Sequence, residues 1–263
     1  MNGKNKFVFV APMYNASAYV QQMLFSIFGQ SYDNWHLILI DDVSDADHLK
    51  KSEEIINSFV YMGSNGTYAA RHTNEVNDSE QIMHSSKVTL IKNATKKWEV
   101  ANVLRGISMC DDNDIIARID ADDWLTDLDA LAMIDAAYTQ TNCDVLWTMH
   151  RWGFSDRNIS AAIPADADPY NYPWVSSHLK TFRKRLINNV NDENFRGENG
   201  NYIRRAGDQA IFLPVLNNAS KRMFLPRCLY HYTIDDVPET YQTDDAKFQR
   251  DEAIFLHQRG YVK

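Results

Sequence analysis

The sequence predicts one α/β domain in which a mainly parallel sheet is flanked by helices. Along residues 1–150, short runs of β-branched and aromatic residues alternate with segments whose apolar residues recur every three or four positions. Strands and helices that alternate in this way form parallel sheets with right-handed crossovers. Acidic residues follow two of the predicted strands, and ligands bind at the carboxyl ends of strands in such sheets.

The strands of this part are predicted from short, mostly apolar runs bounded by turn residues, and the helices from helical spacing of the apolar residues. The strands are expected at residues 7–11 (FVFVA), 37–40 (LILI), 88–91 (VTLI), 115–119 (IIARI) and 144–147 (DVLW). The helices are expected at residues 20–28, 49–59, 100–107 and 128–135. Asn15 or Ser17 is available to cap the first helix.

Two stretches interrupt the alternation. Residues 62–86 are polar and rich in Asn, Ser and His, and they predict a long surface excursion close to a ligand. Residues 150–175 contain several prolines and aromatics and predict loops. Further helices are expected at residues 178–189, 207–216 and 244–260, the second containing Pro214 and the last ending at Gly260, with a strand at residues 228–232.

Composition narrows the class of protein. The chain has 263 residues and a net charge of −8, which argues against a broadly basic surface that coats nucleic acid. A local basic patch is formed by Lys180, Arg183, Lys184 and Arg185. The three cysteines are far apart, which indicates a reducing compartment and neither a disulfide framework nor structural zinc.

The sequence shows neither a signal peptide nor an apolar window long enough to span a membrane. The expectation is therefore a protein of the cytoplasm, in a bacterium or in a virus-infected host cell.

Three carboxylates lie within four positions directly after the predicted strand at residues 115–119. They are Asp120, Asp122 and Asp123. Carboxylates at such a strand end suit a hard divalent cation that holds phosphate oxygens. The alternative is an acidic turn in which Asp123 or Thr126 caps the next helix.

Several common signatures of nucleotide and hydrolase sites are missing from the sequence. We find no Gly-x-Gly-x-x-Gly after the first strand, no Gly-x-x-x-x-Gly-Lys loop and no Gly-x-Ser-x-Gly elbow. A sheet with acids at its strand ends then needs another way to hold phosphate, and a carboxylate-bound metal ion provides one.

Four motifs occur in order along the chain: APMYN at residues 11–15, SIFGQ at 26–30, IDDVSD at 40–45 and IDADD at 119–123. They resemble those of the inverting family-2 glycosyltransferases, which have the nucleotide-diphospho-sugar transferase (GT-A) fold. The resemblance covers about residues 5–235. It implies that residues 1–150 bind a nucleotide sugar and that residues 151–263 form the acceptor side of the same GT-A domain.

The resemblance also implies roles for individual residues on the donor side. Asp42 is expected to contact the base, usually uracil, through a charge-assisted hydrogen bond. Asp120 is expected near the ribose, and Asp122 is expected to bind the metal and the diphosphate. The other expected donor contacts are Pro12, Tyr14, Asn15 and Asn102.

On the acceptor side, Gly207-Asp208-Gln209 matches the pattern that carries the catalytic base, so Asp208 is the candidate base. The alternative is that Asp208 only caps a helix. His231 matches a histidine that completes the metal site, although a lone histidine on a strand is as often a packed residue.

His178, Lys180 and Arg183 lie in a segment that resembles the family's acceptor region. Lys180 or Arg183 is a candidate partner for diphosphate or for an anionic acceptor, and a solvated basic helix face is the alternative.

The chain departs from the family pattern at two positions. Val43 stands where a glycine usually follows the paired aspartates, so that turn is expected to differ. Ala101 stands where an arginine often precedes the helix asparagine, so one phosphate contact is expected from elsewhere, with Lys97 and Arg105 as candidates.

The sequence and the resemblance together predict a metal-dependent inverting glycosyltransferase that uses Mn²⁺ or Mg²⁺ and a nucleotide-diphosphate sugar, most simply a UDP-sugar. The acceptor is expected to be a hydroxyl of a glycan or protein glycan. The alternatives are a hydroxymethylated base of viral DNA as acceptor, a nucleotidyltransferase, and a non-catalytic nucleotide-sugar-binding module. The sugar, the linkage and the oligomeric state are not determined by the sequence.

Overall fold

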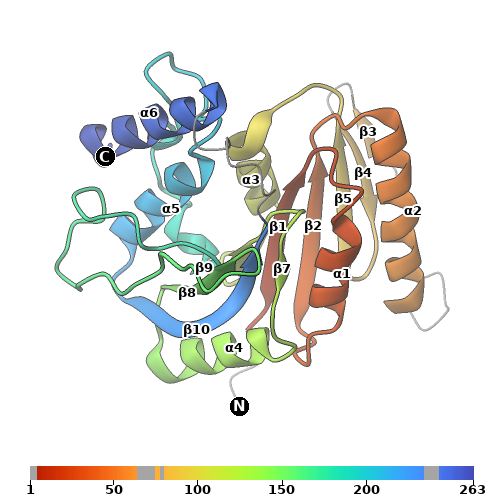
Figure 1. Ribbon diagram of the computed structural model, residues 1–263, viewed down its shortest axis with the longest axis horizontal. Helices are drawn as coiled ribbons and strands as arrows, with labels where there is room; N and C mark the ends of the chain where they lie inside the picture. The colour runs from red at the N-terminus through yellow and green to blue at the C-terminus, as the bar shows by residue number, and fades with distance from the viewer. Residues whose placement is uncertain (1–4, 64–74, 78–79, 234–242) are drawn as a thin grey trace.

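A computed structural model describes residues 5–63, 75–77, 80–233 and 243–263. Its centre is a set of parallel strands in the order β5-β2-β1-β6, which are Val88–Asn93, Trp35–Asp41, Phe7–Met13 and Ile115–Arg118. The helices α1 (Val20–Phe28), α2 (Ala46–Gly63) and α3 (Trp98–Ser108) connect these strands (Figure 1). This is the alternation that the sequence predicted.

Antiparallel strands extend the sheet on both sides. On one side, β4 (Glu80–His84) pairs with β5, and β3 (Glu75–Asn77) pairs with β4. On the other side, β9 (Lys180–Arg183) lies between β6 and β8 (Val145–Trp152) and is antiparallel to both. Beyond β8 follow β10 (Arg222–Tyr232) and the short β7 (Trp124–Leu125), which complete a mixed sheet.

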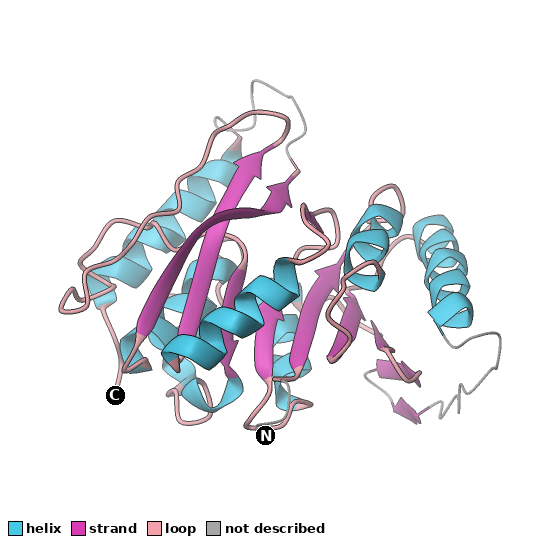
Figure 2. Ribbon diagram, turned by 90° about the horizontal axis from the view of Figure 1, so that it is seen from below, coloured by secondary structure: helices cyan, strands magenta, loops and turns pink. Residues whose placement is uncertain are grey.

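Helices cover both faces of this sheet, as Figures 1 and 2 show. Alternate residues of β1 point to opposite faces, as the pleat of a strand requires. Phe7 and Phe9 belong to a core with α1, α2 and α4 (Ala130–Thr141), whereas Val8 and Val10 belong to a second core with α3 and α5 (Gly207–Asn218). Two short 3₁₀ helices (Lys184–Leu186 and Asp192–Phe195) and α6 (Asp244–Arg259), which is followed by Gly260, complete the chain.

The helix α3 packs closely on the centre of the sheet. A Cβ atom at Gly106 would lie 2.6 Å from Val10 Cγ1 and 3.2 Å from Ile40 Cδ1. Only a residue without a side chain allows this approach, so Gly106 sets the distance between α3 and β1.

Two predictions of secondary structure were wrong. The excursion expected over residues 62–86 contains β3 and β4, and α2 extends to Gly63; residues 64–74, 78 and 79 lie outside the described residues. The helix expected over residues 178–189 is instead β9 followed by a 3₁₀ turn. β3 and β4 pair with their neighbours in sequence as antiparallel hairpins, whereas β9 pairs with strands distant in sequence, and there tertiary pairing overrides the local pattern.

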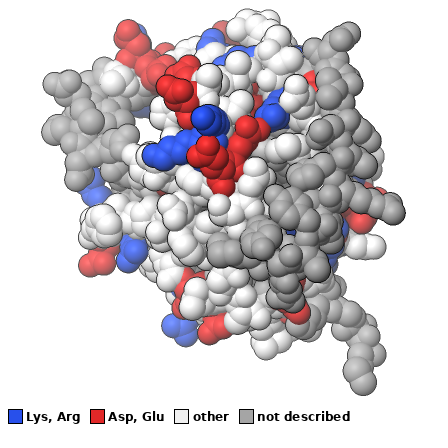
Figure 3. Space-filling view, turned by 90° about the vertical axis from the view of Figure 1, so that its right-hand side faces the viewer, with Lys and Arg blue, Asp and Glu red and all other residues white. Residues whose placement is uncertain are grey.

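No helix within the described residues is both long enough and apolar enough to cross a bilayer. Cys110 and Cys143 are buried, Cys228 is exposed, and all three are free thiols, in line with the expectation of no disulfide framework. On the face shown in Figure 3, basic and acidic side chains lie beside one another, and the described residues form no broad basic area there.

Candidate active site

A cleft of about 2540 Å³ opens at the carboxyl ends of β1, β2 and β6. Its walls come from segments that are far apart in the sequence, including the loops after β1 and β6, the start of α3 and the ends of β8 and β10. Most of the site residues predicted from the sequence line it: Pro12, Tyr14, Asn15, Asp42, Asn102, Asp120, Asp122 and His231. The other predicted residues, His178, Lys180, Arg183 and Asp208, do not line it.

Asp42 is buried at the floor of the cleft and holds the start of α3. Its carboxylate accepts hydrogen bonds from the backbone N–H groups of Lys97 (2.7 Å) and Trp98 (2.9 Å) and from Asn93 Nδ2 (3.0 Å). A carboxylate at the start of a helix satisfies N–H groups that have no partner inside the helix. Asp42 therefore positions α3, in addition to the predicted contact with the base.

The loops after β1 and β2 are joined by Asn15. Its backbone N–H donates to Ser44 Oγ (2.9 Å), and its side chain exchanges hydrogen bonds with the carboxylate and backbone N–H of Asp45 (2.8 and 2.9 Å). Asn15 and Val43 both have positive φ, 53° and 64°. Val43 thus keeps the left-handed conformation that the family's usual glycine adopts without strain, and a β-branched residue there stores conformational energy.

Asn102 lines the cleft and carries a buried donor that is unused. The residue is 2% exposed, and its Oδ1 accepts a hydrogen bond from Asn93 Nδ2 (2.7 Å). Its Nδ2 has no hydrogen-bond partner among the described residues. A buried donor without a partner is costly, so a ligand oxygen is expected to accept from it.

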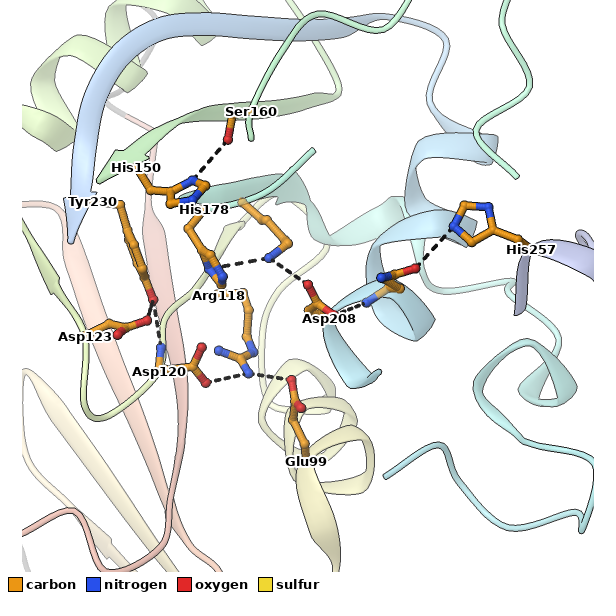
Figure 4. A network of polar contacts seen from close by, with 12 residues as sticks. Glu99, Arg118, Asp120, Asp123, His150, Ser160, His178, Asp208, Tyr230 and His257 are labelled. Carbon is orange, nitrogen blue, oxygen red and sulfur yellow. Dashed lines mark hydrogen bonds and ion pairs between the residues drawn. The ribbon is translucent and has the colours of Figure 1, made fainter. Parts of the chain in front are cut away.

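Asp120 belongs to a chain of alternating charges (Figure 4). Arg118 Nη2 lies 2.8 Å from Asp120 Oδ1 and 2.5 Å from Glu99 Oε1. Arg118 is 4% exposed, so both carboxylates compensate a buried cation. Burial raises the pKa of Glu99 to about 7, against the opposing effect of Arg118. Glu99 also lines the cleft, although the sequence did not single it out.

The remaining two acids of this turn have different environments. Asp123 is 1% exposed, and its carboxylate accepts from Tyr230 Oη (2.7 Å) and from the backbone N–H of Thr233 (2.7 Å). Burial raises its pKa well above the usual range. Asp122 is exposed and lines the cleft, while its backbone carbonyl accepts from Thr233 Oγ1 (2.5 Å). Asp123 is thus held inside the protein by hydrogen bonds, whereas Asp122 is accessible to a ligand in the cleft.

His231 stacks on Trp124, with ring centroids 3.6 Å apart, and its Nδ1 accepts a hydrogen bond from Arg151 Nε (2.9 Å). Burial lowers its pKa to about 4, so the ring is neutral at pH 7. Because an arginine N–H only donates, Nδ1 carries no proton and Nε2 must carry it. In this tautomer His231 offers a hydrogen-bond donor, and metal ligation through Nε2 would require loss of that proton.

Two sets of groups fit a divalent cation. Asp120 and Asp122 line the cleft and offer the oxygen ligands that Mg²⁺ and Mn²⁺ prefer. Ligand atoms of Asp120, Asp123 and His178 also lie within 4.8 Å of one another, but Asp123 and His178 do not line the cleft. Oxygen donors that face the cleft suit an ion that also binds a diphosphate.

Asp208 lies in the first turn of α5, where the sequence placed it, but it is not the cap residue. The cap position is Ala206, and Asp208 Oδ1 accepts only from the N–H of the next residue, Gln209 (2.7 Å). Its other oxygen pairs with Lys180 Nζ at 3.5 Å, and Lys180 is 1% exposed.

The basic stretch that includes Lys180 does not form a solvated helix face. Arg183 Nε donates to the carbonyl of Cys143 (3.1 Å), and Lys184 and Arg185 pair with Asp112 (2.8 Å) and Asp144 (2.6 Å). His178 is 7% exposed and stacks on Tyr230, with ring centroids 4.8 Å apart. The structure therefore gives each of these residues an internal partner.

Several cleft residues were missed by the sequence analysis. They are aromatic or basic: Lys96, Trp124, Arg151, Trp152, Phe154, Arg157, Arg204, Arg205 and Arg250. No motif marks them, and only the adjacency of Arg204 and Arg205 to Gly207-Asp208 was a usable signal.

Comparison with known proteins agrees with the resemblance found in the motifs. The family model described as glycosyl transferase family 2 matches residues 8–77. No curated protein matches the chain.

Solved structures match over most of the chain. One is TarS of S. aureus, with a TM-score of 0.60 and 17% identity over 87% of this chain and 37% of that one. Another is residues 1–349 of TarS in complex with UDP-GlcNAc, with a TM-score of 0.60 and 14% identity over 98% of this chain and 68% of that one. A third is the mannosyltransferase PcManGT of Pyrobaculum calidifontis in complex with GDP-Man and Mn²⁺, with a TM-score of 0.58 and 10% identity over 90% of this chain and 59% of that one.

The chain thus spans little more than a third of the whole TarS chain. The matches confirm the predicted GT-A fold and the predicted resemblance to family-2 glycosyltransferases, and they agree with the predicted enzyme class.

Proposed function

We propose that this chain, whose residues 8–77 match the glycosyl transferase family 2 model, transfers a sugar from a nucleotide-diphosphate donor to an acceptor hydroxyl with inversion at the anomeric carbon. The observation that carries the proposal is the convergence of motif residues from four separate segments in one cleft. Residues 1–150 supply the donor side and residues 151–263 the acceptor side. The acceptor that we propose is a hydroxyl of a glycan or protein glycan.

The donor that we propose is a UDP-sugar. TarS has been solved with UDP-GlcNAc and PcManGT with GDP-Man, so proteins of this fold bind different nucleotides. In this chain, Asp42 is the base contact, Asn102 Nδ2 donates to a donor oxygen, and Pro12, Tyr14 and Asn15 surround the nucleoside. The unused Asn102 donor supports this arrangement.

Asp122, with Asp120, would hold Mn²⁺ or Mg²⁺, and the bound ion would offset the charge of the leaving diphosphate. The oxygen-rich, cleft-facing ligand set supports a hard cation. His231, in the tautomer fixed by Arg151, would donate from Nε2 toward a phosphate oxygen.

Asp208 is the proposed base. It takes the proton of the acceptor hydroxyl while the hydroxyl oxygen attacks the anomeric carbon, and the bond between that carbon and the diphosphate oxygen breaks. The buried ammonium of Lys180 holds the carboxylate at the start of α5.

Two substitutions test these roles. Asp122→Asn should lose metal-dependent binding of UDP and all transfer, because it removes a ligand charge. Asp208→Asn should still bind UDP with metal, measured by calorimetry, yet lose transfer. The control is Asp251→Asn, an exposed acid on α6. Full transfer activity in either site variant would remove that residue from its role.

DNA as acceptor gains no support from the structure, because the basic stretch that favoured it is engaged in internal contacts.

A further inference from the structure

A cluster of cations and aromatic rings lies in the cleft, and apart from Tyr14 no motif accounts for its members. We call it the Trp98 cluster; it consists of Tyr14, Lys96, Trp98 and Arg204, which all line the cleft. The Arg204 guanidinium carbon lies 3.6 Å from the Trp98 ring centroid. Lys96 Nζ lies 2.9 Å from the Tyr14 centroid and 5.4 Å from that of Trp98. Two aromatic faces thus position two positive charges.

The backbone at Trp98 fixes this arrangement. Trp98 is the first residue of α3, its φ is 67°, and its N–H donates to Asp42 Oδ2 (2.9 Å). A tryptophan in the left-handed region is strained, and such residues gather at functional sites where the surrounding structure holds them. The hydrogen bond to Asp42 therefore orients the indole against which Arg204 packs.

Neither cation is held in a direct ion pair with a described residue. Among the described residues, neither Lys96 nor Arg204 forms an ion pair through its side chain, whereas the neighbouring Arg205 pairs with Asp245 at 2.6 Å. Partial burial lowers the pKa of Lys96, against the opposing effect of the carboxylates of Asp42, Asp41 and Asp45. Both side chains thus remain available for a direct contact with an anionic ligand.

The same place in the fold needs a phosphate contact. The arginine that often precedes the helix asparagine in the family is Ala101 here. Of the two replacements considered from the sequence, Arg105 is bound to Glu80 (2.5 and 3.1 Å), and Lys97 does not line the cleft. Lys96 and Arg204 do line it, close to the positive end of α3 and to the unused Asn102 donor.

We propose that Lys96 and Arg204, held against Tyr14 and Trp98, bind the diphosphate of the nucleotide donor in place of the arginine that the chain lacks at position 101. The inference rests on the proposed function, because it assumes that the cleft takes a nucleotide-diphosphate donor. In this arrangement Lys96, before α3, and Arg204, before α5, bind the same diphosphate, so both halves of the chain contribute to its recognition.

The test compares three probes that differ only in phosphate: UDP, UMP and uridine, each titrated calorimetrically in Mg²⁺ at two salt concentrations. Arg204→Gln and Lys96→Gln should each weaken UDP binding by about ten- to a hundredfold, because each removes a charge-assisted contact. Uridine binding should change less than twofold, and the salt dependence for UDP should become shallower. Arg204→Lys, which keeps the charge but not the planar group, should recover part of the loss.

Arg105→Gln and Lys97→Gln are the matched controls, since they remove a positive charge near the same helix outside the cleft. They should bind UDP as the unmodified chain does. If the cluster variants also bind UDP normally, this inference is overturned while the proposed function stands. Equal weakening for UDP and uridine would also overturn it, because the cluster would then serve the nucleoside. If the unmodified chain binds no nucleotide, the proposed function itself fails.

Discussion

The ion pair between Lys180 and Asp208 allows a sharp test of how the proposed base is held. The charged groups are 3.5 Å apart, which corresponds to an attraction of about 5 kcal/mol at an effective dielectric constant of about 20 and about 1 kcal/mol in bulk water. The two partners are unequally buried, because the Lys180 side chain is 1% exposed and that of Asp208 is 23% exposed. Removing either partner should therefore have different consequences.

Asp208→Asn should cost about 3–5 kcal/mol of unfolding free energy, because it leaves a buried ammonium group without its counter-charge. Lys180→Met should cost less, about 1–2 kcal/mol, since the remaining carboxylate keeps some contact with water. The double variant should recover most of the loss, because both charges are gone. Burial lowers the pKa of Lys180, so the Asp208→Asn deficit should shrink as the pH rises and the lysine becomes neutral.

Urea unfolding of the four proteins in a double-mutant cycle measures these differences. Lys184→Met is the matched control: its ion pair with Asp112 is shorter, 2.8 Å, but Asp112 is 65% exposed, so the cost should stay below about 1 kcal/mol. If Asp208→Asn is as stable as the unmodified chain, or if the cycle shows no coupling, the pair does not hold the base. The double variant also separates lost transfer from lost folding, since it should be folded and inactive.

Three further predictions concern the frame around the cleft. Val43→Gly should raise the unfolding free energy by about 1 kcal/mol, because glycine relieves the strain of the positive φ, 64°. Val43→Ala should gain little. A glycine variant that is less stable than the unmodified chain would contradict the idea that Val43 is strained. Gly106→Ala should lower the melting temperature, with a net cost of about 1–2 kcal/mol, because its Cβ would lie 2.6 Å from a Val10 methyl. Gly197→Ala is the control and should not lower the melting temperature, because the nearest contact of its Cβ would be 3.5 Å. The third prediction concerns pH. Burial lowers the pKa of His150 from 6.5 to about 4. The neutral form of His150 therefore stabilises the fold above pH 6.5, and this stabilisation is lost as the pH falls toward 4. Chemical unfolding at several pH values should show a shallower acid loss in His150→Asn, and an unchanged slope would exclude this contribution.

The central fold was predictable because its strands are buried on both faces and read as continuous apolar runs. The strands of the β5-β2-β1-β6 centre were all found in this way, together with the helices between them. The acids that follow β2 and β6 were expected at one edge of the sheet, and Asp42 and Asp120 do line one cleft.

The antiparallel strand β9 was not predictable, because its pairing is not local. In β9, Lys180 stands in a run of basic residues that is typical of an exposed helix, yet it is buried between β6 and β8. A buried lysine contradicts the usual location of this residue type, and its counter-charge comes from the distant Asp208, with a further contact to His178 Nδ1. β4 lies between β3 and β5 in local hairpins, but only Ile82 of its five residues is buried, so it lacks the continuous apolar run that marks the central strands.

Motifs located most of the site but did not reveal which groups are already occupied. The sequence assigned the metal to Asp122 and offered Asp123 as a helix cap, but it did not show that the side chain of Asp123 is bound by Tyr230 and by the backbone of Thr233. The sequence offered His231 as a metal ligand but did not show its hydrogen bond from Arg151. These contacts join residues about a hundred positions apart, so no local pattern contains them.

The approach of α5 to α3 has a consequence for how relatives of this chain diverge. A Cβ atom at Gly207 would lie 2.6 Å from the carboxyl carbon of Glu99, which Arg118 holds in place. A side chain at 207 requires the Glu99 carboxylate to move or to be shortened, and either change disturbs its ion pair with Arg118. Substitutions at these positions are therefore expected to occur as correlated pairs among homologues, linking a residue beside the nucleotide site to the residue that precedes the proposed base.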